Sequence, residues 1–123
     1  MPRIRTFRPR ALDGSLMSNP VEYWPLKVIA LDRPYTLAVS RGVSGFKDDS
    51  WIISDPVTGL RVCNVTEYYK GCPIGSVGMG PRAAVRAAHE AIEGLLAMKG
   101  AHRFVAAIEA AAQKFNATLQ QPA

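Results

Sequence analysis

The sequence of 123 residues lacks any apolar run near the ~18 residues that a helical membrane span needs. It therefore predicts a soluble chain without a membrane partner. The N-terminus also lacks the apolar segment of about 7–15 residues that marks a secretory signal. In a chain without such a signal, the two cysteines are expected to stay reduced thiols. We therefore expect a cytoplasmic protein that folds without disulfides.

The motifs of common enzyme classes are also missing. The glycine-rich segment GCPIGSVGMGPR, residues 71–82, contains neither the GxxxxGK[ST] nor the GxGxxG pattern of nucleotide sites. His89 and Glu90 begin the zinc motif HExxH, but position 93 is Glu where that motif requires a second His. Nothing in the sequence places a histidine beside Cys72 to activate it as a nucleophile. We predict no catalytic residue, no metal site and no cofactor.

Acidic residues are absent from the first ten positions, whereas four arginines lie there: Arg3, Arg5, Arg8 and Arg10. Of the 15 Lys and Arg residues, 11 remain in the rest of the chain, against 10 Asp and Glu. The net charge of +5 therefore belongs to the N-terminal segment, and the body of the protein is close to neutral.

Residues 1–19 are predicted to form a flexible basic arm, followed by a single domain over residues 20–123. Arginines spaced through a proline-bounded, extended segment suit contacts with phosphates or with a DNA minor groove. The alternative is a solvated terminal tail, as chain ends often are.

Residues 21–65 predict an antiparallel sheet of three to four strands. VEYWPLKVIAL is rich in branched and aromatic residues, and YTLAVSRGV alternates between apolar and polar side chains. In WIISDPVTGLRV, Asp55, Pro56 and Gly59 are typical turn residues between two strands. A loop over residues 56–59 would pair Ile53 with Val62.

The C-terminal half predicts two helices, at about residues 81–99 and 101–115. Pro81 suits a first helical turn, and Gly100 suits a helix end. Gly94 lies inside the first helix at a cost of about 0.5–1 kcal/mol relative to Ala, so we expect a close-packed neighbour there. Strands followed by helices indicate an α+β fold with both helices packed on the sheet, although one kinked helix is an alternative.

A weak anion site is predicted where the glycine-rich segment meets the first helix, since helix N-terminal N–H groups favour anions. Its residues are Gly78, Gly80, Arg82 and Arg86. The alternative is a flexible linker between the sheet and the helix.

Several aromatic residues form a candidate partner-binding surface: Tyr23, Trp24, Phe46, Tyr68 and Tyr69. Adjacent residues in a strand point to opposite faces, so one member of each Tyr-Trp or Tyr-Tyr pair should lie outside the core. An exposed aromatic side chain suits a protein interface or base stacking.

These patterns favour a small non-enzymatic interaction protein that binds a protein partner or self-associates, of the accessory or inhibitor kind that phages and mobile elements carry. One alternative is a nucleic-acid-binding module that uses the arginine arm. Another is a small thiol or anion-binding enzyme at the glycine-rich segment.

Overall fold

The computed structural model describes residues 5–11, 13–41, 51–65 and 80–116, together with the backbone of residues 67–69 and 72–74. A five-stranded antiparallel sheet has the order β1-β2-β3-β4-β5, and β6 and β7 form a separate hairpin. The elements are β1 Arg5–Phe7, β2 Val21–Ala30, β3 Arg33–Arg41, β4 Trp51–Ser54, β5 Arg61–Asn64, β6 Glu67–Tyr69, β7 Cys72–Ile74, α1 Pro81–Lys99 and α2 Ala101–Lys114. The predicted α+β fold is confirmed, with more strands than expected.

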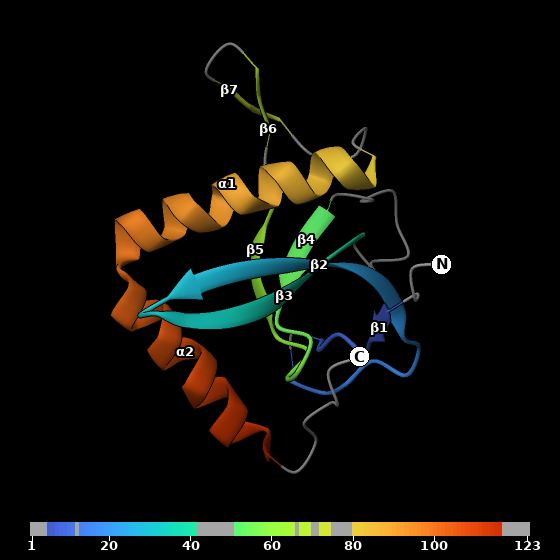
Figure 1. Ribbon diagram of the computed structural model, residues 1–123. Helices are drawn as coiled ribbons and strands as arrows, with labels where there is room; N and C mark the ends of the chain where they lie inside the picture. The colour runs from blue at the N-terminus through green and yellow to red at the C-terminus, as the bar shows by residue number, and fades with distance from the viewer. Residues whose placement is uncertain are drawn as a thin grey trace.

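The two helices meet at an angle, with their corner beside the tip of the β2–β3 hairpin (Figure 1). Gly100 separates them with a φ of 88°, a conformation that glycine adopts easily, so the prediction of two helices is confirmed. Among the described residues, a Cβ added to Gly94 would meet no atom within 4 Å. The described residues therefore provide no close-packed neighbour at Gly94.

The core lies between the helices and one face of the sheet. Ala84 and Ala88 of α1 are fully buried, so their small side chains let the helix approach the strands closely. The core residues are Leu26, Val28, Ala30, Leu37, Val39, Trp51, Ile53 and Val65 beside Ala84, Ala88, Ile92, Phe104 and Val105. This cluster makes one continuous hydrophobic layer.

The turn between β4 and β5 forms as the sequence predicts. Oδ1 of Asp55 accepts a hydrogen bond from the Val57 N–H at 3.0 Å, and Oδ2 accepts one from the Thr58 hydroxyl at 3.0 Å. Gly59 has a φ of 81° and donates its N–H to the Asp55 carbonyl at 2.7 Å. Asp55 is thus the organising residue of the turn.

The predicted register of β4 and β5 was wrong by one residue. Ile53 pairs with Cys63 rather than with Val62, and Ser54 pairs with Arg61. Val62 is the extra residue of a β-bulge, an irregularity that hydrophobic alternation does not predict.

Within the segment that the sequence predicts as a flexible arm, Arg5–Phe7 form β1 and join the sheet. Residues of β1 pair with β2, so that Arg5 lies opposite Tyr23 and Phe7 opposite Val21. Phe7 is 2% exposed and packs edge-on against Tyr23, with ring centroids 5.5 Å apart. Phe7 thereby covers part of the sheet face that lies opposite the helices. Its burial explains why this segment is held on the sheet.

Candidate partner-binding groove

A groove of about 230 Å³ lies between the β4–β5 turn with β5 on one side and the end of α1 with α2 on the other. We call it the β5–α2 groove. Its apolar lining includes Leu60, Val62, Leu95, Phe104 and Ile108. Leu60 is 40% exposed, so part of this apolar surface faces solvent.

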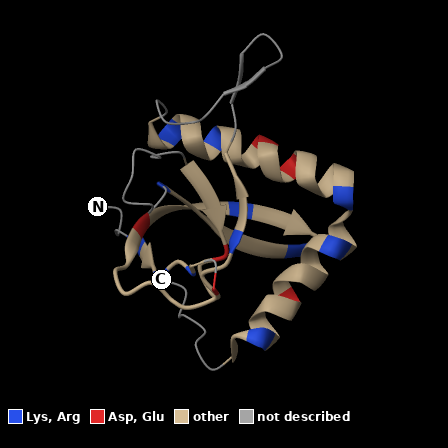
Figure 2. Ribbon diagram, turned by 180° about the vertical axis from the view of Figure 1, so that it is seen from behind, with Lys and Arg blue, Asp and Glu red and all other residues tan. Residues whose placement is uncertain are grey.

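Three cationic side chains line the same groove: Arg61 from β5, Lys99 from α1 and Arg103 from α2. Lys99 and Arg103 are four positions apart on either side of Gly100, and Arg103 is followed one helical turn later by Ala107, which also lines the groove. All three cations are exposed. Basic positions gather at the corner between the two helices (Figure 2).

Within the described part of the chain, no acidic side chain is paired with Arg61, Lys99 or Arg103. Asp55 also lines the groove, but its two carboxylate oxygens already accept hydrogen bonds inside the turn. The groove therefore combines an apolar lining with an excess of positive charge, three cations against the one carboxylate of Asp55.

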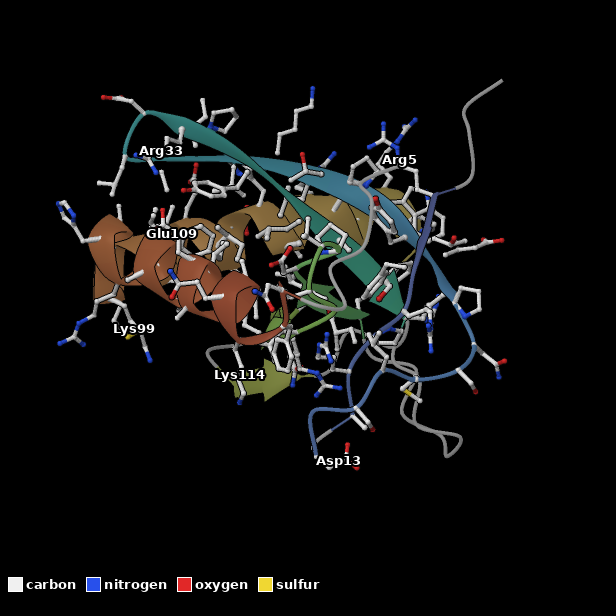
Figure 3. The ribbon with its side chains drawn as sticks, turned by 90° about the horizontal axis from the view of Figure 1, so that it is seen from below. Arg5, Asp13, Arg33, Lys99, Glu109 and Lys114 are labelled. Atoms are coloured by element: carbon white, nitrogen blue, oxygen red, sulfur yellow. The ribbon has the colours of Figure 1, made fainter. Side chains whose placement is uncertain are left out.

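The neighbouring acids are engaged elsewhere. Glu109 accepts a hydrogen bond from Arg33 at 3.2 Å, and Glu93 lies 3.6 Å from His89 on α1. Figure 3 shows Arg33 and Glu109 directed toward one another, with Lys99 apart from them. Both pairs are exposed, so each contributes little to stability.

Arg103 occupies a position that the helix itself disfavours. It lies in the first turn of α2, which contains no acidic residue, where the helix dipole presents partial positive charge. Functional sites often retain residues that lower the stability of the fold, and a cation at a helix N-terminus is such a residue.

A second cavity, of about 330 Å³, lies on the other side of the turn. It is lined by Asp55–Val57, by Tyr35–Leu37 of β3 and by Ile108 of α2, with Arg5 as its cation. Its single cation makes it a weaker candidate for an anionic partner than the β5–α2 groove.

The structure separates the aromatic residues that the sequence grouped into one surface. Tyr23 is 5% exposed beneath Phe7, whereas Trp24 is 39% exposed and meets Trp51 edge-on with centroids 5.5 Å apart. The two side chains lie on opposite faces of β2, as alternation predicts. Phe46 lies outside the described residues, as do the side chains of Tyr68 and Tyr69 on β6.

Two of the four N-terminal arginines bond to the chain itself. Nε of Arg8 donates to the Met17 carbonyl at 2.8 Å. Arg10 donates from Nε to the Thr58 carbonyl at 2.6 Å and from Nη1 to the Gly14 carbonyl at 2.7 Å. Its guanidinium also lies 3.6 Å from the ring centroid of Phe115.

Of the other two arginines, Arg5 is part of β1, and Arg3 lies outside the described residues. The described part of the predicted arm therefore does not extend away from the body as a chain that tracks phosphates would.

The predicted anion site is only partly described. Gly78 lies outside the described residues, and Gly80 caps α1 without a side-chain hydrogen bond. Arg82 and Arg86 are exposed on α1. The anion site stays a prediction.

The thiol hypothesis concerns Cys72, whose backbone lies in β7 and whose side chain is outside the described residues. Burial raises the pKa of the other thiol, Cys63, which makes its reactive thiolate scarcer at neutral pH. Among the described residues, no group of three or more His, Cys, Asp or Glu side chains could hold a metal ion.

The sequence did not predict the β5–α2 groove, because its cations are brought together only by folding. Arg61 is 38 positions before Lys99, and each of the three resembles an ordinary solvated charge when its own element is considered alone. One signal was available. Neither position 95 nor position 107, one turn before Lys99 and one turn after Arg103, holds an acid that could pair with these cations.

Comparison of the chain with protein-family models, with curated protein sequences and with solved structures found no match. Among the described helices, none has the length and apolar character to cross a membrane. Function is therefore argued from the groove and its residues.

Proposed function

We propose that this protein is a small non-enzymatic interaction protein whose protein partner docks in the β5–α2 groove. The observation that carries the proposal is an open apolar groove lined by three cations that form no ion pair with any described acid. Exposed apolar surface beside unpaired charge is typical of a binding site, because a partner can bury the apolar surface and neutralise the charge.

Several features favour a protein over a nucleic acid as the partner. The lining of the groove is mainly apolar, whereas nucleic-acid sites are dominated by phosphate contacts. Arg8 and Arg10 already donate to carbonyls of the chain itself. Outside the first ten residues, the sequence has almost equal numbers of basic and acidic side chains.

The groove also favours binding over catalysis. Its described lining includes no histidine or cysteine, the side chains that most often act as a base or a nucleophile at neutral pH. The two polar side chains of the turn, Asp55 and Thr58, are hydrogen-bonded to one another. Their geometry serves the turn rather than a substrate.

Photo-crosslinking from the groove tests the proposal. Ala107 lines the groove and is exposed, whereas Ala110 is an exposed alanine of the same helix that does not line it. We expect a photoreactive phenylalanine analogue at position 107, in cells of the native host, to form a defined protein adduct that position 110 does not form.

Equal adducts from both positions, no adduct from position 107, or adducts only with nucleic acid would contradict a protein-binding groove. An adduct with a second copy of the chain would identify the partner as the protein itself.

A further inference from the structure

Resting on the proposed function, we infer that the β5–α2 groove takes an extended acidic segment of a partner protein, which adds to the edge of β5 as a further strand of the sheet. The sheet ends at β5, and the groove begins where the sheet ends. The inference combines this open edge with the apolar lining and the three cations.

The outer edge of β5 is open in the part of the chain that the structure describes. β5 is the last strand of the sheet, and its ladder bonds run to β4. Among the described residues, no backbone hydrogen bond reaches Arg61–Asn64 from its other side. Unpaired N–H and C=O groups at an edge are a template for another strand, and a bound extended segment satisfies them.

The side chains of an added strand would alternate between two directions. One set would point toward the apolar lining formed by Leu95, Phe104 and Ile108. A carboxylate opposite Arg61 would make a cross-strand charge pair, and an acidic residue where the segment leaves the edge of β5, beside the helix corner, would meet Lys99 and Arg103. Alternating acidic and apolar residues therefore complement both the charge and the lining of the groove.

The same cations disfavour other occupants. A second copy added edge to edge would bring two sets of Arg61, Lys99 and Arg103 together, which like-charge repulsion opposes. A helical segment could fill the apolar lining but would leave the edge of β5 without hydrogen bonds. An acidic strand satisfies the edge, the lining and the charge together.

Three synthetic probes test the inference with the full chain. The first is a capped heptapeptide of alternating Glu and Val, the second has Lys in place of each Glu, and the third is the acidic peptide N-methylated at alternate amides. We expect nuclear magnetic resonance titration to show the acidic peptide binding at least about tenfold more tightly than either of the others. Shifts should centre on β5 and α2.

Charge reversal in the protein provides the matched comparison. Arg61→Glu combined with Arg103→Glu should weaken binding of the acidic peptide by about tenfold or more, while Lys27→Glu, an exposed change on β2 outside the groove, should leave it unchanged. Circular dichroism of each variant confirms that the fold is retained.

Each other result overturns a defined part of the inference. Equal binding of the lysine peptide, or no binding of the acidic one, overturns the acidic partner. Equal binding of the N-methylated peptide overturns strand addition. In these cases an adduct at position 107 would still support the groove as a protein-binding site. Loss of that adduct as well would remove the proposed function.

Discussion

Arg10 contacts three separate segments of the chain, at Gly14, at Thr58–Gly59 and at Phe115. Its side chain joins the carbonyls of Thr58 and Gly14, and it stacks on the ring of Phe115. Its backbone N–H donates to the Gly59 carbonyl at 2.9 Å. Burial lowers the pKa of this guanidinium, which nevertheless remains charged at neutral pH.

We expect Arg10→Lys to lower the free energy of unfolding by about 1–2 kcal/mol, because an ammonium cannot reproduce the planar fork that reaches both carbonyls. Urea denaturation measures the change. Arg82→Lys, on the exposed face of α1, is the control and should lie within about 0.5 kcal/mol of the parent. Equal midpoints for both variants would show that the Arg10 contacts contribute no stability.

The two glycines of the helical region should respond with opposite signs. Gly94→Ala should stabilise the protein by about 0.5–1 kcal/mol, because the added methyl meets no atom of the described residues within 4 Å and the unfolded chain loses freedom. Gly100→Ala should destabilise it by about 1 kcal/mol or more, since φ is 88° there. Thermal unfolding distinguishes them, and a shift of the same sign in both variants would contradict the backbone argument.

The raised pKa of the Cys63 thiol makes the free energy of unfolding depend on pH in the alkaline range. Because burial raises the pKa of its thiol in the folded state, the folded protein binds that proton more tightly than the unfolded chain does. This contribution to stability is complete below the thiol's unfolded pKa, about 8.5, and is lost as the pH rises through the folded value.

In a Cys72→Ser background, iodoacetamide should modify Cys63 more slowly than a free thiol at pH 8. An equal or faster rate would contradict a raised pKa.

At the scale of elements, β1 is a strand that the sequence did not predict. Phe7→Ala should lower the free energy of unfolding by about 3 kcal/mol, because the ring is buried against Tyr23 and its removal leaves a cavity. Thr6→Ala, the exposed neighbour on the same strand, should change it by less than about 0.5 kcal/mol. Guanidinium unfolding compares the two, and similar effects would mean that β1 is not part of the cooperative unit.

The elements that the sequence predicts are those whose signals are local, whereas an element that depends on tertiary contacts was not predicted. The helix boundaries follow from Pro81 and Gly100, and the turn follows from Asp55 and Gly59, because each of these residues acts on its own backbone. β1 is three residues long, and Phe7 has no local pattern that distinguishes it from a tail. Its position depends on Tyr23, which lies 16 positions later.

At the scale of the whole molecule, the groove joins residues from a strand and from both helices. We expect Arg103→Gln to raise the free energy of unfolding by about 0.3–1 kcal/mol, since it removes a cation from the N-terminal turn of α2. The same variant should weaken partner binding. Calorimetry beside the peptide titration checks both effects, and a loss of stability would indicate that Arg103 has a structural role instead.

The order of strands and helices along the chain also sets the order in which they are synthesised. All five strands of the main sheet are complete by Asn64, whereas the helices that cover the apolar face begin at Pro81 and end at Lys114. During synthesis, the face that carries Leu37, Val39 and Ile53 therefore emerges before any residue that will bury it. Phe115, the stacking partner of Arg10, arrives later still. A nascent chain that stops before α1 exposes an apolar sheet face that is prone to aggregation. We therefore expect chaperone binding to matter most during this interval of synthesis.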